Sequence, residues 1–201
     1  MLKRLLSKIL VAVFCFSVFG AIAAAEVKFD TAVPGAENTA PKKKLALMFV
    51  NNAKTTYDAE LNMMIADNFD KMLKPKYQVI TGNKYVELLN KAGIVDISTA
   101  ERADIVSVVQ GEDVDYILYA ELQPFVRKEK VTFFTYGLEM TAVMPIKIID
   151  VKKNVYLYNG KFTELAKDSS AIGGIGNKSV AMKAMDNTLD KMNSVIAARL
   201  P

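Results

Sequence analysis

The run Leu-Ala-Leu-Met-Phe-Val at residues 45–50 decides the fold that the sequence predicts. It is a continuous apolar segment of strand length, which is typical of a strand that is covered on both faces. Across 57–73, apolar residues then recur at three- and four-residue spacing, as on one face of a helix, until Lys74 and Pro75 stop the pattern. A short strand is predicted at 77–81. Two strands joined by a helix are expected to be parallel, with a right-handed crossover.

Three further helices are predicted from periodicity and end signals. The second helix spans 85–92 and has Gly93 behind it as a C-cap. The third begins at Ser98, because Ser98 and Glu101 have the spacing of a capping box. The last helix spans about 179–200. Its inward stripe is predicted to be core and not a methionine-rich binding face, and it comprises Met182, Met185, Leu189, Met192 and Ile196.

The remaining strands are predicted to be antiparallel, since short polar turns join them. A strand at 115–125 is followed by a polar hairpin turn at 127–130 and a long β segment at 131–151, bent or broken near Gly137 and Pro145. After a turn at 152–154, a strand runs over 155–158, and 160–165 extends it. The order βαβααβββα predicts an α/β (α+β) fold with a single mixed sheet of about five strands packed with helices.

The N-terminus has the three-part layout of a cleavable secretory signal peptide at 1–25. Lys3, Arg4 and Lys8 form a basic region, no charge occurs from Ile9 to Ala25, and three alanines end the segment. A retained membrane anchor is the main alternative, although the uncharged run is short for a span of about 20 residues. Lipid modification of Cys15 is a weaker one, because Phe14 occupies a position where a lipobox needs a small residue.

The chain after Ala25 is predicted to form a flexible lead at 26–43 and one domain at 44–201. Of the 26 lysines and arginines three lie in the signal, so 23 face 22 acidic residues in the mature chain, a net charge of +1. This balance does not suggest nucleic-acid binding. The basic run Lys42–Lys44 is interpreted as a solvated gatekeeper before a strand, with attraction to a membrane surface as the alternative.

The residue types that are absent limit the chemistry. The chain has no histidine, and its one cysteine, Cys15, lies in the predicted signal. Disulfides, a cysteine nucleophile, a Ser-His-Asp triad and Cys/His zinc sites are therefore excluded from the mature chain. No cofactor, metal or catalytic residue is predicted. Residues 173–179 (Gly-Gly-Ile-Gly-Asn-Lys-Ser) are interpreted as a hinge and not as a phosphate-binding loop, because Ile172 and Asn177 replace the required glycines.

Three segments resemble a domain found in bacterial envelope proteins: residues 44–50, 114–120, and 148–155. The chain is similar over about 44–200 to the curli-secretion protein CsgG, the N-terminal domain of TolB and the LpoB-type activators of penicillin-binding proteins. It departs from the family pattern at Ala120, usually glycine, and at Lys153-Asn154, usually Thr-Gly; asparagine tolerates the left-handed conformation that such a turn requires. The resemblance implies a binding or assembly part without family catalytic residues. Many relatives are lipoproteins.

These observations favour a secreted, non-catalytic binding or assembly module of a bacterial cell envelope, periplasmic or envelope-associated after cleavage near Ala25. Its partner is expected to be an envelope protein, with membrane contact only during export or peripherally, and its oligomeric state is left open. The candidate partner surface is Phe133, Phe134 and Tyr136, beside the sheet edge; core packing is the simpler interpretation of the same residues. The alternatives are a small-ligand carrier with a pocket between sheet and helices and, with less support, a carboxylate-based hydrolase.

Overall fold

The computed structural model describes residues 41–96, 98–171 and 174–201. The predicted signal peptide at 1–25, residues 26–40 of the predicted lead, and Ile172 and Gly173 of the predicted hinge lie outside the described residues. The described elements, in chain order, are β1 (Lys43–Asn51), α2 (Asp58–Leu73), β2 (Tyr77–Thr81), α3 (Lys84–Lys91), α4 (Arg102–Ser107), β3 (Tyr116–Leu122), β4 (Val126–Val131), β5 (Tyr136–Asp150), β6 (Val155–Ser170) and α5 (Asn177–Arg199). They confirm the predicted fold class, with one open mixed sheet of six strands in the described part of the chain.

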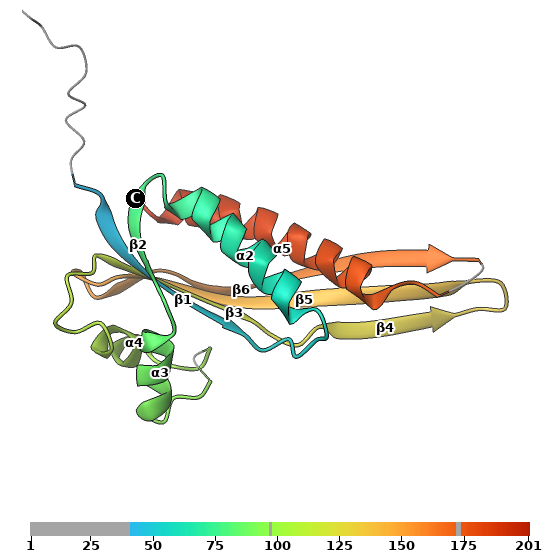
Figure 1. The fold of residues 1–201 in the computed structure, drawn as a ribbon, viewed down its shortest axis with the longest axis horizontal. Coiled ribbons are helices and arrows are strands. Elements are labelled where there is room, and N and C mark those ends of the chain that lie inside the picture. The colour runs from blue at the N-terminus through green and yellow to red at the C-terminus, as the bar shows by residue number, and fades with distance from the viewer. Residues whose placement is uncertain (1–40, 97, 172–173) are drawn as a thin grey trace, which may run out of the picture. The chain divides into compact units, whose positions relative to one another are not determined.

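The sheet joins a parallel half to an antiparallel half (Figure 1). β1 pairs in parallel with β2, as the helix between them predicted, and it also pairs in parallel with β3. β5 pairs antiparallel with β6 along its whole length, and its other edge pairs with β3 at residues 146–150 and with β4 at residues 136–141. β4, β5 and β6 therefore form a three-stranded ribbon that continues beyond the end of β1 and β3.

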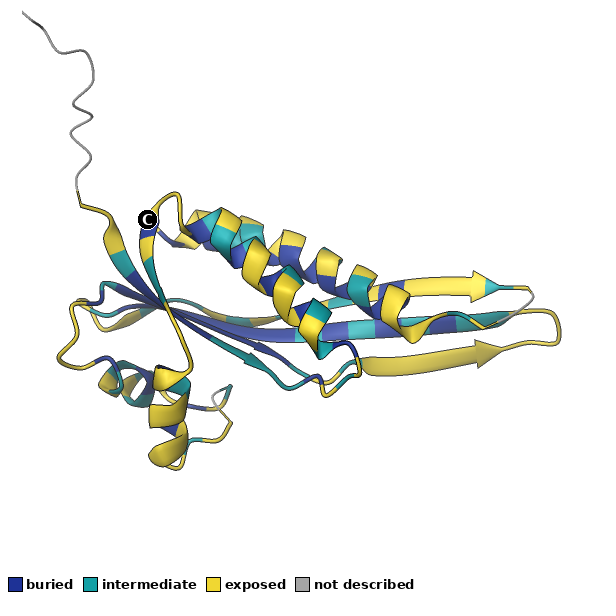
Figure 2. Ribbon diagram, in the orientation of Figure 1, coloured by how far each residue is buried: buried dark blue, intermediate teal, exposed yellow. Residues whose placement is uncertain are grey.

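Helices cover the two sheet faces unequally. α2 and α5 pack over one face, where α5 contacts β5 and β6. α3 and α4 cover the opposite face only near β1 and β3, through buried residues such as Tyr85 and Ile105 (Figure 2). The predicted inward stripe of the last helix is confirmed at Met185, Leu189, Met192 and Ile196, which are all buried, while Met182 is partly buried against the same core.

Two predictions about the antiparallel half were wrong. Residues 127–130 are not a turn but the middle of β4, and the turn falls at 132–135. All six residues of β4 are exposed, so charged side chains are compatible with a strand there. β5 is also continuous through Gly137 and Pro145. The pairing of β5 with β3 stops at Ile146, which pairs with Ala120, so Pro145 lies just outside that ladder. The N–H group that proline lacks therefore removes no hydrogen bond from it.

The sequence predicted the correct kinds of helix-end and turn residues, but not always at the correct positions. The capping box of α4 lies three residues later than predicted, with Glu101 as N-cap and Asp104 reaching back to its backbone. Ser98 bonds to Asp96 instead, because that carboxylate lies within the same turn. Gly93 follows α3 with a positive φ of 84°, and Asn154 has a φ of 52° in the turn between β5 and β6, as predicted.

Candidate functional site: the β4–β5 hairpin tip

The hairpin tip is the turn at 132–135 between β4 and β5. Thr132 and Thr135 close it: the Thr132 N–H donates to the Thr135 carbonyl at 2.8 Å, and the Thr135 N–H donates to the Thr132 hydroxyl at 3.0 Å. The two hydroxyl oxygens are 2.6 Å apart. The threonines thus supply the hydrogen-bond partners that close this tight turn. The two residues between them are not needed to close it.

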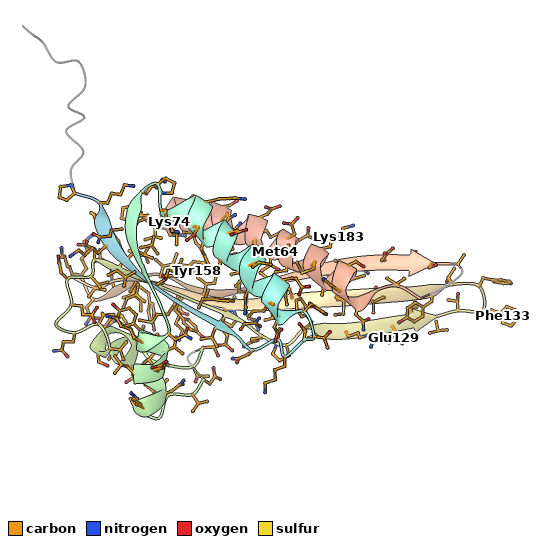
Figure 3. The ribbon with its side chains drawn as sticks, viewed as in Figure 1. Met64, Lys74, Glu129, Phe133, Tyr158 and Lys183 are labelled. Atoms are coloured by element: carbon orange, nitrogen blue, oxygen red, sulfur yellow. The ribbon has the colours of Figure 1, made fainter. Side chains whose placement is uncertain are left out.

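Phe133 and Phe134, the residues between the threonines, project into solvent. These two residues are 94% and 76% exposed, and their ring centroids lie 5.1 Å apart in an edge-to-face arrangement. Figure 3 shows Phe133 at the end of the hairpin. Tyr136 lies differently: it begins β5, is half-buried against the main core, and accepts a hydrogen bond from Arg127 at 3.3 Å. The structure therefore brings two of the three predicted residues to one exposed point and places the third at its base.

The edge strand β4 adjoins the tip. Among the described strands only β5 pairs with it, so one row of its backbone N–H and C=O groups has no strand partner. Figure 2 shows β4 exposed along its whole length. Arg127 and Glu129 form an ion pair on this strand. An unpaired edge can accept an extended segment of another protein, and charged side chains restrict which segments fit.

A buried polar cluster occupies a second place in the sheet. Glu121, 6% exposed, accepts hydrogen bonds from the Tyr119 hydroxyl and from Asn52 at 3.0 Å. Lys147 donates to the Ala100 carbonyl at 2.6 Å, and burial lowers its pKa. Burial, followed by the bond to Glu121, raises the pKa of Tyr119, so its phenol stays protonated. We interpret the bond from Lys147 to Ala100 as holding the loop before α4 against the sheet.

Hollows that could admit a small ligand differ in size and place. Between helix and sheet, the hollow lined by Met72, Tyr77 and Ile196 holds about 30 Å³, room for about one water, and a hollow between β6 and α5 holds about 190 Å³. Larger open hollows of about 340 Å³ lie beside Lys147 and over Gly137. Drug-sized ligands usually occupy about 300–1,000 Å³ of concave space.

Within the described ranges, no helix is long and apolar enough to cross a membrane. Over the same residues, no group of three acidic, histidine or cysteine side chains is placed to hold a metal ion.

One feature of the site was missed at the level of sequence. Lysines from β4 and β6 gather on one face of the ribbon, and the two-residue spacing of Lys128 and Lys130 was the available signal. That spacing places both on the same side of a strand, but it has this meaning only if 127–130 is a strand. Because a turn was predicted at 127–130, the spacing was not recognised as a strand pattern.

Comparisons with known proteins complete the description. No family model matches the chain, and no curated protein matches it. Similar solved structures include the hypothetical protein CT253 from Chlamydia trachomatis, with a TM-score of 0.49, 12% identity, and coverage of 78% of this chain and 99% of that one. The lipoprotein GNA1162 from Neisseria meningitidis has a TM-score of 0.39 and 14% identity, covering 75% and 99%.

The LpoB C-terminal domain from Salmonella enterica is also similar, with a TM-score of 0.34, 11% identity, and coverage of 64% of this chain and 86% of that one. LpoB is one of the proteins that the sequence resembles. The resemblance to CsgG and to the TolB N-terminal domain stays a prediction. At these identities and TM-scores, the likenesses carry no inference about a binding site or an activity.

Proposed function

We propose that this chain is an exported, non-catalytic binding or assembly module of a bacterial cell envelope, and that its hairpin tip binds a protein partner. The proposal includes the domain limits 44–201, cleavage near Ala25, and Phe133, Phe134 and Tyr136 as the partner surface. The leader-like N-terminus, the lack of histidine and the family resemblance of three segments support the location and the absence of catalysis.

One observation carries the proposed surface: two adjacent phenylalanines, 94% and 76% exposed, stand at the end of a turn that its own threonines close. Neither ring contributes to the core, so the fold does not account for their apolar character. Burying one such side chain in an interface is favourable by about 1.5–3 kcal/mol, and aromatic anchors are common at the centre of interfaces. The unpaired edge of β4 offers backbone groups beside these anchors.

The test is crosslinking in the native envelope with the variant Phe133→Ser/Phe134→Ser. We expect the wild-type protein to capture a defined partner and the variant to lose at least nine-tenths of that yield, measured by quantitative mass spectrometry. The matched control is Met63→Ser/Val95→Ser, which removes two apolar side chains that are 62% and 80% exposed elsewhere. The free energy of unfolding of both variants should lie within about 0.5 kcal/mol of the wild-type value, because all four side chains are on the surface.

Two results would contradict the proposal. If the Phe133→Ser/Phe134→Ser protein captures the same partner with wild-type yield, the tip is not the binding surface. If the exported protein turns over a cell-wall or glycan substrate, and one carboxylate substitution stops the turnover, the module is an enzyme.

A further inference from the structure

The ribbon face opposite α5 gathers lysines from two strands that flank β5. Residues directly paired across antiparallel strands share a face, and Leu138 and Met140 of β5 point into the core under α5. The alternate residues of β5 and their partners therefore point the other way. Lys128 pairs with Glu139, which pairs with Lys167; Lys130 pairs with Gly137; and Lys161 pairs with Pro145. We call Lys128, Lys130, Lys161, Lys167 and Glu139 the lysine face.

The lysine face carries more positive charge than its own ion pairs neutralise. Its four lysines are exposed and oppose one glutamate, a net charge of +3 against +1 for the whole chain after Ala25. Lys167 pairs with Glu139 at 2.7 Å, while Lys128, Lys130 and Lys161 form no ion pair with a carboxylate of the described residues. Lys167, then Lys128 and Lys130, hold the pKa of Glu139 below its usual range.

The shape of this face is open. Gly137 lacks a side chain, and a hollow of about 340 Å³ lies over it; the polar residues that border this hollow are Lys130, Glu139, Lys167, Asp168 and Ser169. Val126 and Leu165, 48% and 41% exposed, flank Thr141 one row further along the same face. α3 and α4 stay at the other end of the sheet, as Figure 2 shows. The face thus combines unpaired cations with exposed apolar side chains and no deep pocket.

We propose that the lysine face binds the surface of a bilayer that contains anionic phospholipid, a role beyond the protein binding proposed for the hairpin tip. A planar anionic surface requires a high density of cations and not a shaped pocket, and β4 and β6 present such a density here. Long lysine side chains reach the headgroup level, while Val126 and Leu165 contact the less polar layer behind it. Each lysine near such a surface strengthens binding by about 1 kcal/mol, about fivefold.

The experiment is vesicle sedimentation of the protein in the form in which cells export it, with its N-terminus determined by mass spectrometry. Vesicles of phosphatidylglycerol and phosphatidylcholine at equal parts are compared with pure phosphatidylcholine at low salt. The test variant is Lys128→Gln/Lys130→Gln/Lys161→Gln. The matched control is Lys54→Gln/Lys71→Gln/Lys76→Gln, which removes the same charge from exposed lysines just before α2, on α2 and in the turn after it.

We expect wild type to bind the anionic vesicles and not phosphatidylcholine alone, with binding weakened by salt. The test variant should lose about a hundredfold in partition coefficient, and the control variant less than about fivefold. Glu139→Gln should gain several-fold, because it removes the only carboxylate of the face. Phe133 and Phe134 are unchanged in every variant, so any contribution of the tip cancels in these ratios.

Equal losses in the two lysine variants would show a general effect of net charge and overturn the proposal. Wild-type binding that needs no anionic lipid, or no binding to either vesicle, would overturn it as well; the last result would favour an acidic protein as the occupant. Since the crosslinking test depends on the hairpin tip and this one on the lysine face, failure of one proposal is distinguishable from failure of the other.

Discussion

At the scale of single residues, the carboxylate of Asp115 contributes to holding the first strand in place. Asp115, just before β3, accepts from the backbone N–H of Lys44 at 2.9 Å and from Lys152 at 2.5 Å. Its side chain is only 17% exposed. Lys152, followed by the Lys44 N–H, holds the pKa of Asp115 below its usual range. One side chain thus joins β1, β3 and the turn after β5.

The depressed pKa sets the direction of a pH effect. The unfolded chain has an aspartate pKa of about 3.9, so the stabilisation by Asp115 is present above that pH and is lost as the pH falls through the lower folded value. We expect Asp115→Asn to cost about 1–3 kcal/mol at pH 7 and to flatten the acid limb of the free energy of unfolding. Urea denaturation from pH 7 to pH 2 measures both effects.

Asp113→Asn is the control, because that carboxylate is 76% exposed and, among the described residues, bonds only to the Lys44 ammonium. It should change stability by less than about 0.5 kcal/mol. If wild type and Asp115→Asn lose stability in parallel as the pH falls, Asp115 does not have the role assigned to it.

At the scale of elements, α5 covers β5 and β6 on one face of the sheet. Its buried stripe packs against β5 and β6, and Met185 is fully buried in it. Met185→Ala should destabilise the protein by about 2–5 kcal/mol, because it removes apolar contacts and leaves a cavity. Met63→Ala, in the same class of substitution on α2, should cost under about 0.5 kcal/mol, since Met63 is 62% exposed. Thermal or urea unfolding of the two variants measures both losses of stability. Similar losses would contradict the role assigned to burial.

At the scale of the described fold, stability should differ between the two halves of the sheet. Every residue of β3 is buried between paired strands, whereas every residue of β4 is exposed and one edge has no strand partner. Segments with few buried contacts open locally at a free energy below that of global unfolding. Residues 126–135 should therefore exchange their amide hydrogens well before residues 116–122, as measured by hydrogen–deuterium exchange with peptide resolution. Equal protection of the two segments would contradict this prediction.

The predictions from sequence succeeded where a signal is contained within one segment. The apolar run before Asn51 predicted a central strand, the helical spacing of Met185 and Leu189 predicted a buried stripe, and Asn154 predicted a left-handed turn residue. Each depends on local patterning or backbone sterics, which short sequence stretches carry in full.

The predictions failed where strand identity depends on a distant partner. Residues 127–130 are polar and charged, which locally favours a turn, yet their hydrogen bonds to β5 make them a strand. For the candidate site, the sequence located Phe133 and Phe134 as an aromatic cluster but not their exposure, because core and surface aromatics look alike in a chain. The exposure follows from the turn at 132–135, which was predicted five residues too early.

The amino-acid sequence by itself therefore determined the parallel start of the sheet, the helices that cover it and the thiol- and imidazole-free chemistry after Ala25. Only the tertiary structure decided that β3 and β4 share one edge of β5, that a turn of threonines projects two phenylalanines, and that Lys128 and Lys167 occupy one face. The reason is physical: helical periodicity and chain reversal are local, but strand register is set by hydrogen bonds between segments tens of residues apart, and register determines which side chains meet.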